Sequence, residues 1–297
     1  MHNGILNIYK EADYTSSDVV QVVKKITKSK AGHTGTLDPM ATGVLPICLG
    51  KATKIADYIM GGDKEYIAQV ILGEATDTCD AYGAIIGAAK MSPVRDEILA
   101  VLPQFSGEIS QIPPMYSALK VGGKRLHDLA RQGITIERNA RQITIHSLEV
   151  LKWDLPSSFV IKVKCSKGTY IRTLCDDIGR ALGGYAHMGK LLRTTSSNFT
   201  LETALTLDKL AKGDLDKIVM PIEKALSGFP KVYIKESGAK LLANGNKLPL
   251  EHARYADNLQ KDTLYTTFTH DGNLAGIFRA ESEILRPVTM LLDLHGN

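Results

Sequence analysis

One carboxylate, Asp38, stands in a run of small residues where it could do chemistry. The run at 32–45 reads GHTGTLDPMATGVL, and its glycines let the backbone turn and approach a ligand closely. Pro39 pushes Asp38 toward an extended backbone. A short carboxylate on a stiff loop, with room for a ligand beside it, could act as a nucleophile. The same residues also suit a plain turn capped by Asp38, because Asp-Pro is common in turns.

Two other motifs could supply partners for this carboxylate. Tyr66 lies near the start of a β-rich run at 64–72, where it is either a packed tyrosine or a platform on which a base stacks. Arg172 follows a glycine turn, at the start of a helix expected over 169–182. It is either a surface cation or the partner of a buried carboxylate. A partner matters because burial raises the pKa of an Asp, whereas a fixed guanidinium lowers it again.

Patterns typical of other chemistries are missing from the sequence. There is no G-x-x-x-x-G-K-[ST] and no G-x-S-x-G motif, so cofactor-dependent and serine-hydrolase chemistry lack support. The eight histidines include no pair at i, i+4, and we expect no metal site. The four cysteines form no C-x-x-C pair, which favours a reduced, cytoplasmic protein.

Positive charge is concentrated around the candidate site motifs. Residues 21–56, 120–141 and 162–193 carry net charges of +5, +4 and +5, although the whole chain carries only +4. Each window alone could be an ordinary solvated face. If the three converge in the fold, they form a groove for a polyanion such as nucleic acid.

The order of expected elements indicates an α+β fold on a mainly antiparallel sheet. Strands are expected at 3–9, 44–49, 64–72, 143–153 and 159–165, and helices at 19–28, 51–60, 94–102, 125–132 and 169–182. A domain boundary is plausible near 228–230, because short strand-like runs dominate the 231–297 region. No apolar run is long enough for a membrane span, and the first ten residues do not resemble a secretory signal.

The motifs resemble, in order and spacing, those of the TruB family of tRNA pseudouridine synthases. The similar segments span residues 1–200 and are the Asp38 run, 63–66, 76–83, 113–120, 167–172 and 192–194. The resemblance implies an α+β pseudouridine synthase catalytic domain with a mixed, mainly antiparallel sheet at 1–230. It also implies a small PUA-like RNA-binding β domain at 231–297.

The resemblance further implies that the enzyme isomerises uridine to pseudouridine at position 55 in the T-loop of tRNA, without a cofactor. The uridine must first leave its stack. Asp38 would be the nucleophile, and whether it attacks C1′, attacks the base or works through a glycal is left open. Tyr66 would stack on the flipped base and assist a proton transfer. Arg172 would pair with Asp38 and orient it.

The substrate-binding residues also follow from the resemblance. Leu191 or Leu192 would form an apolar wall for the detached uracil, and His33 would stack in the opened loop. Tyr170 would lie under the site, and Asp80 would touch the substrate strand. The predicted phosphate contacts are Lys54, Lys64, Lys120, Lys124 and Arg125.

Two alternatives remain open at the level of sequence. One is a guide-dependent enzyme of the same family that modifies ribosomal RNA inside a ribonucleoprotein. The other is a non-catalytic RNA-binding or RNA-folding protein on the same scaffold. The expected partner is tRNA, with no membrane and no protein partner, and we expect a cytoplasmic monomer.

Overall fold

The structure is a computed structural model that describes residues 2–255 and 259–292. The predicted C-terminal domain at 231–297 therefore falls partly outside the described residues. No helix in the described ranges is long and apolar enough to cross a membrane.

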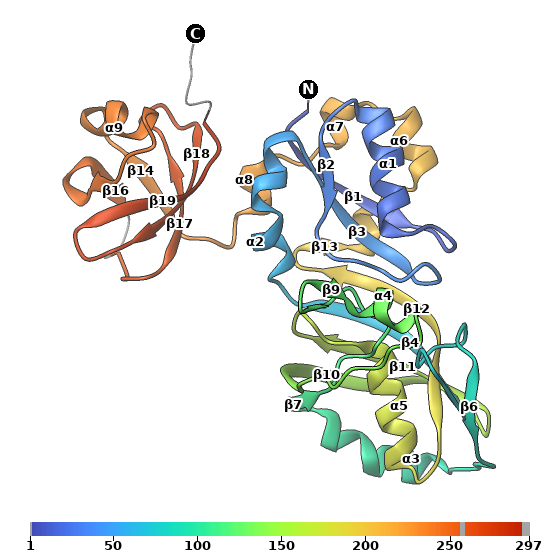
Figure 1. The fold of residues 1–297 in the computed structure, drawn as a ribbon. Helices are drawn as coiled ribbons and strands as arrows, with labels where there is room; N and C mark the ends of the chain where they lie inside the picture. Colours follow the sequence, from blue (N-terminus) through green and yellow to red (C-terminus); the bar gives the residue numbers. More distant parts are fainter. Residues whose placement is uncertain (1, 256–258, 293–297) are drawn as a thin grey trace.

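A mixed sheet forms the larger part of the molecule (Figure 1). Its hydrogen-bonded order is β1 (Gly4–Lys10), β3 (Thr42–Leu49), β12 (Ala186–Ser196), β4 (Lys64–Leu72), β11 (Ser158–Cys165), β10 (Arg141–Asp154) and β7 (Gly107–Gln111). Along this order only β12 and β3 run parallel, at Leu192 and Arg193, within the part of the chain that the structure describes. Two short strands lie off this order: β2 (Ala31–His33) pairs with β3, and β13 (Phe199–Thr200) pairs with β12. The predicted α+β class with a mainly antiparallel sheet is confirmed.

Helices pack on the sheet through apolar positions at helical spacing. In α5 (Ile171–Ala181), Leu174, Cys175 and Ile178 are completely buried and join the core that also contains Phe159. The other helices are α1 (Ser16–Thr27), α2 (Ala56–Met60), α3 (Arg95–Val101), α4 (Leu126–Ala130), α6 (Leu207–Lys212), α7 (Leu215–Ile218), α8 (Ile222–Ala225) and α9 (Ala239–Ala243). Short 3-10 helices lie at Gly50–Ile55, Leu102–Phe105, Leu201–Thr203, Glu236–Gly238 and Leu250–His252.

Helix α1 begins earlier than the sequence predicted. Thr15 is the N-cap: its hydroxyl accepts the Asp18 N–H, and the Asp18 carboxylate accepts the Thr15 N–H. This reciprocal capping box satisfies two of the free N–H groups at the helix start. Ser16 therefore lies inside the first turn, where its hydroxyl is free to bond elsewhere.

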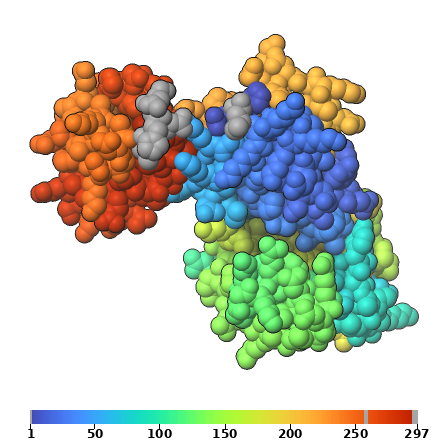
Figure 2. All heavy atoms as spheres, turned by 45° about the horizontal axis from the view of Figure 1, so that its top comes forward, coloured from blue at the N-terminus to red at the C-terminus, as the bar shows by residue number. Residues whose placement is uncertain are grey.

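A second sheet forms a lobe of its own, orange to red in Figures 1 and 2. Its order is β15 (Leu248–Pro249), β19 (Ile284–Met290), β18 (Leu274–Ala280), β17 (Leu264–Phe268), β14 (Lys231–Ile234) and β16 (Ala253–Tyr255). It has its own core, which includes Val232, Phe278 and Leu285. The sheet begins directly after the predicted boundary, and its assignment as a PUA-like RNA-binding domain stays a prediction.

Two hairpins extend from the larger sheet. The first joins β5 (Glu74–Thr76) to β6 (Ile85–Ala88), and its connecting loop bridges to β12 between Asp80 and Met188. The second joins β8 (Lys120–Val121) to β9 (Lys124–Arg125) and leads into α4. The loop between β5 and β6 contacts Arg172 through Thr78 and Asp80, and the segment that precedes β8 contacts it through the Tyr116 carbonyl.

Candidate active site

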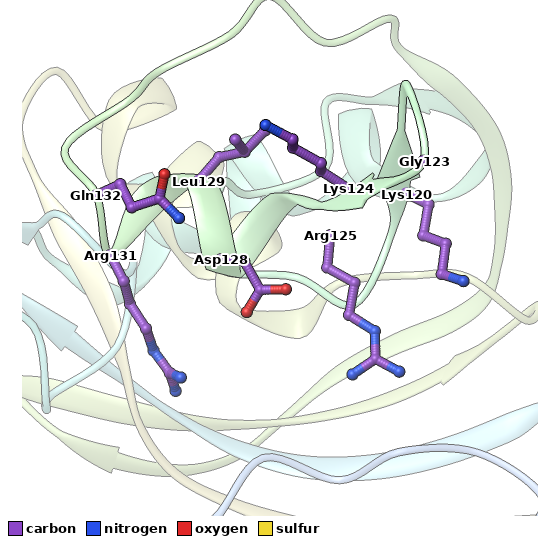
Figure 3. A pocket seen from close by; sticks show the side chains of 8 residues that line it. All are labelled: Lys120, Gly123, Lys124, Arg125, Asp128, Leu129, Arg131 and Gln132. Carbon is purple, nitrogen blue, oxygen red and sulfur yellow. The ribbon is translucent and has the colours of Figure 1, made fainter.

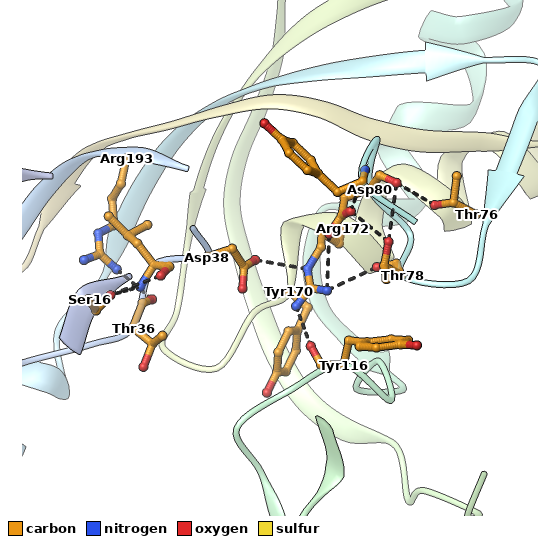
Figure 4. A network of polar contacts seen from close by, with 12 residues as sticks. Ser16, Thr36, Asp38, Thr76, Thr78, Asp80, Tyr116, Tyr170, Arg172 and Arg193 are labelled. Atoms are coloured by element: carbon orange, nitrogen blue, oxygen red, sulfur yellow. Dashed lines mark hydrogen bonds and ion pairs between the residues drawn. The ribbon is translucent and has the colours of Figure 1, made fainter. Parts of the chain in front are cut away.

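Arg172 is the centre of a polar cluster that joins three loops (Figure 4). Its Nε lies 3.1 Å from Asp38 Oδ2, and its Nη1 lies 3.5 Å from Asp80 Oδ2. Nη1 also donates to the Thr78 carbonyl at 3.1 Å, and Nη2 donates to the Tyr116 carbonyl at 2.7 Å. A planar guanidinium can address several acceptors at once, which a lysine ammonium cannot do in this geometry. The structure thus favours the predicted pairing of Arg172 with Asp38 over a surface cation.

The Asp38 loop is fixed by polar groups on both sides. Because Thr15 and not Ser16 caps α1, the Ser16 hydroxyl is free to bond the Asp38 loop. Ser16 Oγ accepts the Leu37 N–H at 2.8 Å and donates to the Leu37 carbonyl at 3.1 Å. The buried Lys10 ammonium donates to the Pro39 carbonyl at 2.8 Å. The residues on both sides of Asp38 are therefore held by side chains, which limits where its carboxylate can move.

Arg193 is the third anchor of this loop. Its guanidinium is buried, donating to the Val44 carbonyl through Nε at 2.7 Å and to the Gly35 carbonyl through Nη2 at 3.2 Å. It comes from β12, directly beside β3 in the parallel part of the sheet. Arg193 therefore ties the start of the Asp38 loop to the strand that follows it.

Asp80 holds the second loop in place from inside the protein. Its carboxylate is only 3% exposed and accepts from the Thr78 hydroxyl at 2.7 Å and from the Tyr82 N–H at 3.0 Å. The predicted contact of Asp80 with the substrate strand stays untested, and its burial against Arg172 favours a positioning role instead.

A glutamine fixes the start of α5, and hence Arg172. Gln111 accepts the Tyr170 N–H through Oε1 at 2.8 Å and donates to the Tyr170 carbonyl through Nε2 at 3.0 Å. Tyr170 is partly buried at the N-cap of α5, and burial raises the pKa of its phenol. It lies one residue before the helix that presents Arg172, and its predicted place under the bound substrate stays a prediction.

The electrostatics of Asp38 reflect both burial and its charged neighbours. Burial raises the pKa of the Asp38 carboxyl, and the Asp80 carboxylate adds to that increase. The Arg172 guanidinium and, more weakly, the Lys10 ammonium act in the opposite direction. The side chain is still 33% exposed, so the carboxylate can be reached from solvent. A reachable carboxylate with a raised pKa and a fixed cation beside it is suited to nucleophilic or acid-base work.

Tyr66 and Leu191 lie on the same face of the sheet. Leu191 pairs with Ala68 and Tyr66 pairs with Arg193 in the β12–β4 ladder, and alternate residues of a strand share a face. Leu191 is buried in the core, whereas Leu192 points to the other face and is partly exposed. Burial raises the pKa of the Tyr66 phenol still further above physiological pH, where a phenol is already neutral. Leu191 is thus the better placed of the two leucines for an apolar wall beside Tyr66.

His33 ends β2 five residues before Asp38. Its Nδ1 accepts the Gly35 N–H at 3.4 Å, and burial lowers the pKa of the ring. A neutral imidazole at this place is suited to stacking, and its stacking in the opened RNA loop stays a prediction.

The predicted phosphate contacts fall into two groups. Lys120, Lys124 and Arg125 are exposed and line an open hollow of about 680 Å³ together with Arg131 (Figure 3). This basic segment, 120–132, rests on a small core of Met115, Leu126 and Leu129. Met115 of that core is followed in the chain by Tyr116, whose carbonyl accepts from Arg172. The segment that lines the hollow is therefore linked to the Arg172 cluster through the residue next to its core.

The other two lysines are already engaged within the protein. Lys64 is buried, and its ammonium donates to the carbonyls of Met60 and Gly62 at the end of α2. The prediction of Lys64 as a phosphate contact is therefore not supported, because its charge is used to cap carbonyls. Lys54 is exposed but donates to the Met290 carbonyl of the second sheet at 3.0 Å.

Sequence reasoning missed Lys10, Gln111 and Arg193 as parts of the site. Arg193 could have been suspected, because an arginine beside two leucines in an apolar strand needs buried acceptors. Lys10 and Gln111 give no such signal, since each ends a strand where polar residues are ordinary. Among the described residues, no three His, Cys, Asp or Glu side chains gather in a way that could hold a metal ion.

Comparison with known families agrees with this geometry. Residues 23–171 match the TruB family pseudouridylate synthase N-terminal domain, and residues 172–227 match the tRNA pseudouridylate synthase B C-terminal domain. Together the two matches include Asp38, Tyr66 and Arg172, and they end before the second sheet begins.

Relatives named tRNA pseudouridine synthase B are similar along nearly the whole chain. The protein of Clostridium tetani (strain Massachusetts / E88) is 44% identical over 292 residues, which is 98% of this chain and 100% of the relative. That of Alkaliphilus oremlandii (strain OhILAs) is 48% identical over 248 residues, or 83% of each chain.

Solved structures share the fold as well. A chain in an H/ACA ribonucleoprotein bound to a substrate RNA containing 2′-deoxyuridine has a TM-score of 0.75 and 27% identity, with 98% of this chain and 86% of that chain covered. A chain of a Cbf5–Nop10–Gar1 complex has a TM-score of 0.75 and 30% identity, covering 98% and 85%.

Proposed function

The chain belongs to the TruB family of pseudouridylate synthases, and we propose that it isomerises the uridine at position 55 in the T-loop of tRNA to pseudouridine. The observation that carries the proposal is the Arg172 cluster, which holds the Asp38 carboxylate at 3.1 Å while leaving it reachable from solvent. The names of the relatives that match the chain along its length support tRNA as the substrate.

In this reaction the base leaves C1′ through N1 and returns through C5. The C5–H bond is replaced by a C5–C1′ bond, and N1 gains a proton, so there is no net redox change. Asp38 would be the nucleophile, and a carboxylate that attacks a sugar or a base is an established form of covalent catalysis. Arg172 would keep the carboxylate ionised and aimed, because it opposes the increase in pKa that burial causes.

Tyr66 and Leu191 would hold the base once it is detached. The neutral Tyr66 ring offers a stacking face on the strand next to Leu191, and the leucine closes the space with apolar atoms. An apolar wall lets the uracil rotate without hydrogen bonds that would fix its orientation. The phenol hydroxyl is a candidate to assist the proton transfer from C5.

Binding would depend on the basic segment 120–132 and on His33. The uridine must leave the folded T-loop before Asp38 can reach it, and ring stacking by His33 would offset part of the stacking that is lost. Lys120, Lys124 and Arg125 would contact phosphates, an interaction that weakens as salt rises.

We further propose that the protein acts as a monomer in the cytoplasm on free tRNA. All four cysteines are free, which fits a reducing compartment. The likeness to chains from H/ACA ribonucleoproteins keeps the guide-dependent alternative as the second candidate. Relatives that match nearly the full length of this chain and carry the tRNA enzyme's name favour the first.

Release of tritium from RNA labelled at C5 of uridine tests the proposal, because pseudouridine formation replaces that hydrogen. We expect the purified protein to release tritium from a tRNA transcript with no guide RNA or second protein added. Replacing the target uridine by cytidine should abolish the release. Release that appears only with a guide ribonucleoprotein would favour the second candidate, and no release from either would contradict the proposal.

A further inference from the structure

Tyr82 is an exposed aromatic side chain beside the Arg172 cluster, and the mechanism above gives it no role. It is 71% exposed, although it follows the buried Asp80 by only two residues. Ile85 and Ile86, at the start of β6 on the same hairpin, are 60% and 68% exposed. An exposed aromatic ring offers a face on which a nucleic-acid base can stack.

The loop that carries Tyr82 is held firmly at both ends. The Asp80 carboxylate accepts the Tyr82 N–H at 3.0 Å, and the Asp77 carboxylate accepts the Ala84 N–H at 2.8 Å. The Ala81 N–H donates to the Met188 carbonyl of β12 at 2.9 Å. A Cβ on Gly83 would lie 2.3 Å from Thr78 Oγ1, so the turn packs closely against Thr78 at this residue. The ring is therefore displayed from a fixed backbone, and a partner that stacks on it orders little more than the ring itself.

The loop is joined to the catalytic carboxylate by a single side chain. Arg172 contacts Asp38 through Nε at 3.1 Å and Asp80 through Nη1 at 3.5 Å. Whatever RNA segment places a nucleotide at Asp38 must therefore pass close to the loop that presents Tyr82. When one nucleotide is extruded from an RNA loop, the base next to it loses a stacking partner.

We propose that Tyr82 stacks on an unpaired base of the substrate RNA next to the extruded uridine. The proposal rests on the proposed function, because it assumes that an RNA loop opens over Asp38. An aromatic ring accepts any base face, so the contact strengthens binding without reading sequence. The neighbouring isoleucines cannot stack in this way, and they distinguish base stacking from a general apolar contact with a protein or a second copy of the chain.

Four proteins test the proposal: wild type, Tyr82→Ala, Tyr82→Phe and the matched control Ile86→Ala. KM and kcat are measured by tritium release from a T-stem-loop RNA, with thermal unfolding as the check on folding. We expect Tyr82→Ala to raise KM at least about five-fold while kcat stays unchanged. A five-fold change corresponds to ~1 kcal/mol, which is the lower limit for the stacking of one base on an aromatic ring. Tyr82→Phe and Ile86→Ala should stay within two-fold of wild type.

Abasic sites in the RNA identify the base that stacks. An abasic nucleotide beside the target uridine should weaken RNA binding by the wild type. The same abasic site should leave RNA binding by Tyr82→Ala unchanged, because that variant already lacks the ring.

Three results would overturn the proposal. The first is an equal effect of every abasic site on both proteins, the second is a Tyr82→Ala variant equal to wild type, and the third is a Tyr82→Phe variant as weak as Tyr82→Ala. Equal losses in Tyr82→Ala and Ile86→Ala would indicate a general apolar contact instead. Absence of tritium release by the wild type would refute the proposed function, and RNA binding by the four proteins would still test the stacking contact.

Discussion

The Asp38 loop and the basic segment 120–132 hold their charged groups in opposite ways. Around Asp38 the cations are buried, and the guanidiniums of Arg172 and Arg193 are saturated with carboxylate and carbonyl oxygens. In the basic segment the cations are exposed and rest on a small apolar core. Buried cations fix the position of a reacting group, whereas exposed cations can adapt to a polyanion. The two regions divide positioning and binding between them, and changes to one should leave the other largely intact.

Apart from removal of the Asp38 carboxylate itself, the largest effect should come from Arg172→Lys. An ammonium cannot reach Asp38, Asp80 and the Tyr116 carbonyl together, so the carboxylate would be misplaced, and kcat should fall at least about 100-fold. RNA affinity should stay within a few-fold of wild type. Arg180→Lys is the matched control on the same helix, because Arg180 is 61% exposed and pairs only with Asp176 among the described residues, so it should stay within two-fold. Equal kinetics in the two variants would mean that Arg172 does not position Asp38.

Arg193→Met should separate loop anchoring from catalysis. It leaves the carbonyls of Gly35 and Val44 without their buried donor, which should lower the free energy of unfolding by about 2 kcal/mol or more. Chemical denaturation measures this loss, and kcat should fall with it because the Asp38 loop loosens. Arg286→Met, at an exposed ion pair in the second sheet, should change stability by less than about 1 kcal/mol. An Arg193→Met protein as stable as wild type would contradict the anchoring role.

The pH dependence of turnover should report the raised pKa of Asp38. The carboxylate is the active form, so single-turnover rates should fall as pH decreases through a value above the ordinary ~3.9 of Asp. Asp80→Asn removes a negative charge that raises this pKa, so it should move the acidic limb to lower pH. An unchanged limb, or one displaced to higher pH, would show that the limb does not arise from Asp38.

The smallest effect should come from single changes in the basic segment. Lys124→Gln should weaken RNA binding a few-fold and reduce the slope of log K against log salt by about 0.7 to 0.9, with kcat unchanged. Lys212→Gln, an exposed lysine at the end of α6, serves as the control. If Lys124→Gln lowered kcat instead, the division between positioning and binding would be wrong.

Much of the fold could be predicted from periodicity. The run at 64–72 became β4 with the same bounds, and Ile171–Ala181 lies inside the helix expected at 169–182. The neighbours of each strand could not be predicted, because the parallel contact of β12 with β3 depends on tertiary packing. That contact is what brings Arg193 to the Asp38 loop.

Some residues of the site could be predicted from the sequence and others could not, for a physical reason. From the residues alone, Asp38 could have been a turn cap and Arg172 a surface cation, and the family resemblance favoured the alternative in which the two pair. The structure does not support the prediction for Lys64, because its ammonium turns back to carbonyls that close the preceding helix. Whether a charge faces solvent or backbone is decided by tertiary contacts, which no local pattern records.

The most direct test of the account compares wild type with Asp38→Asn in tritium release from a T-stem-loop RNA, with RNA binding measured on the same samples. The account predicts that the wild type releases tritium, that Asp38→Asn is slower by more than roughly 10⁴-fold, and that the two bind RNA within a few-fold of each other. Tritium release by Asp38→Asn at a rate near that of wild type would contradict the account.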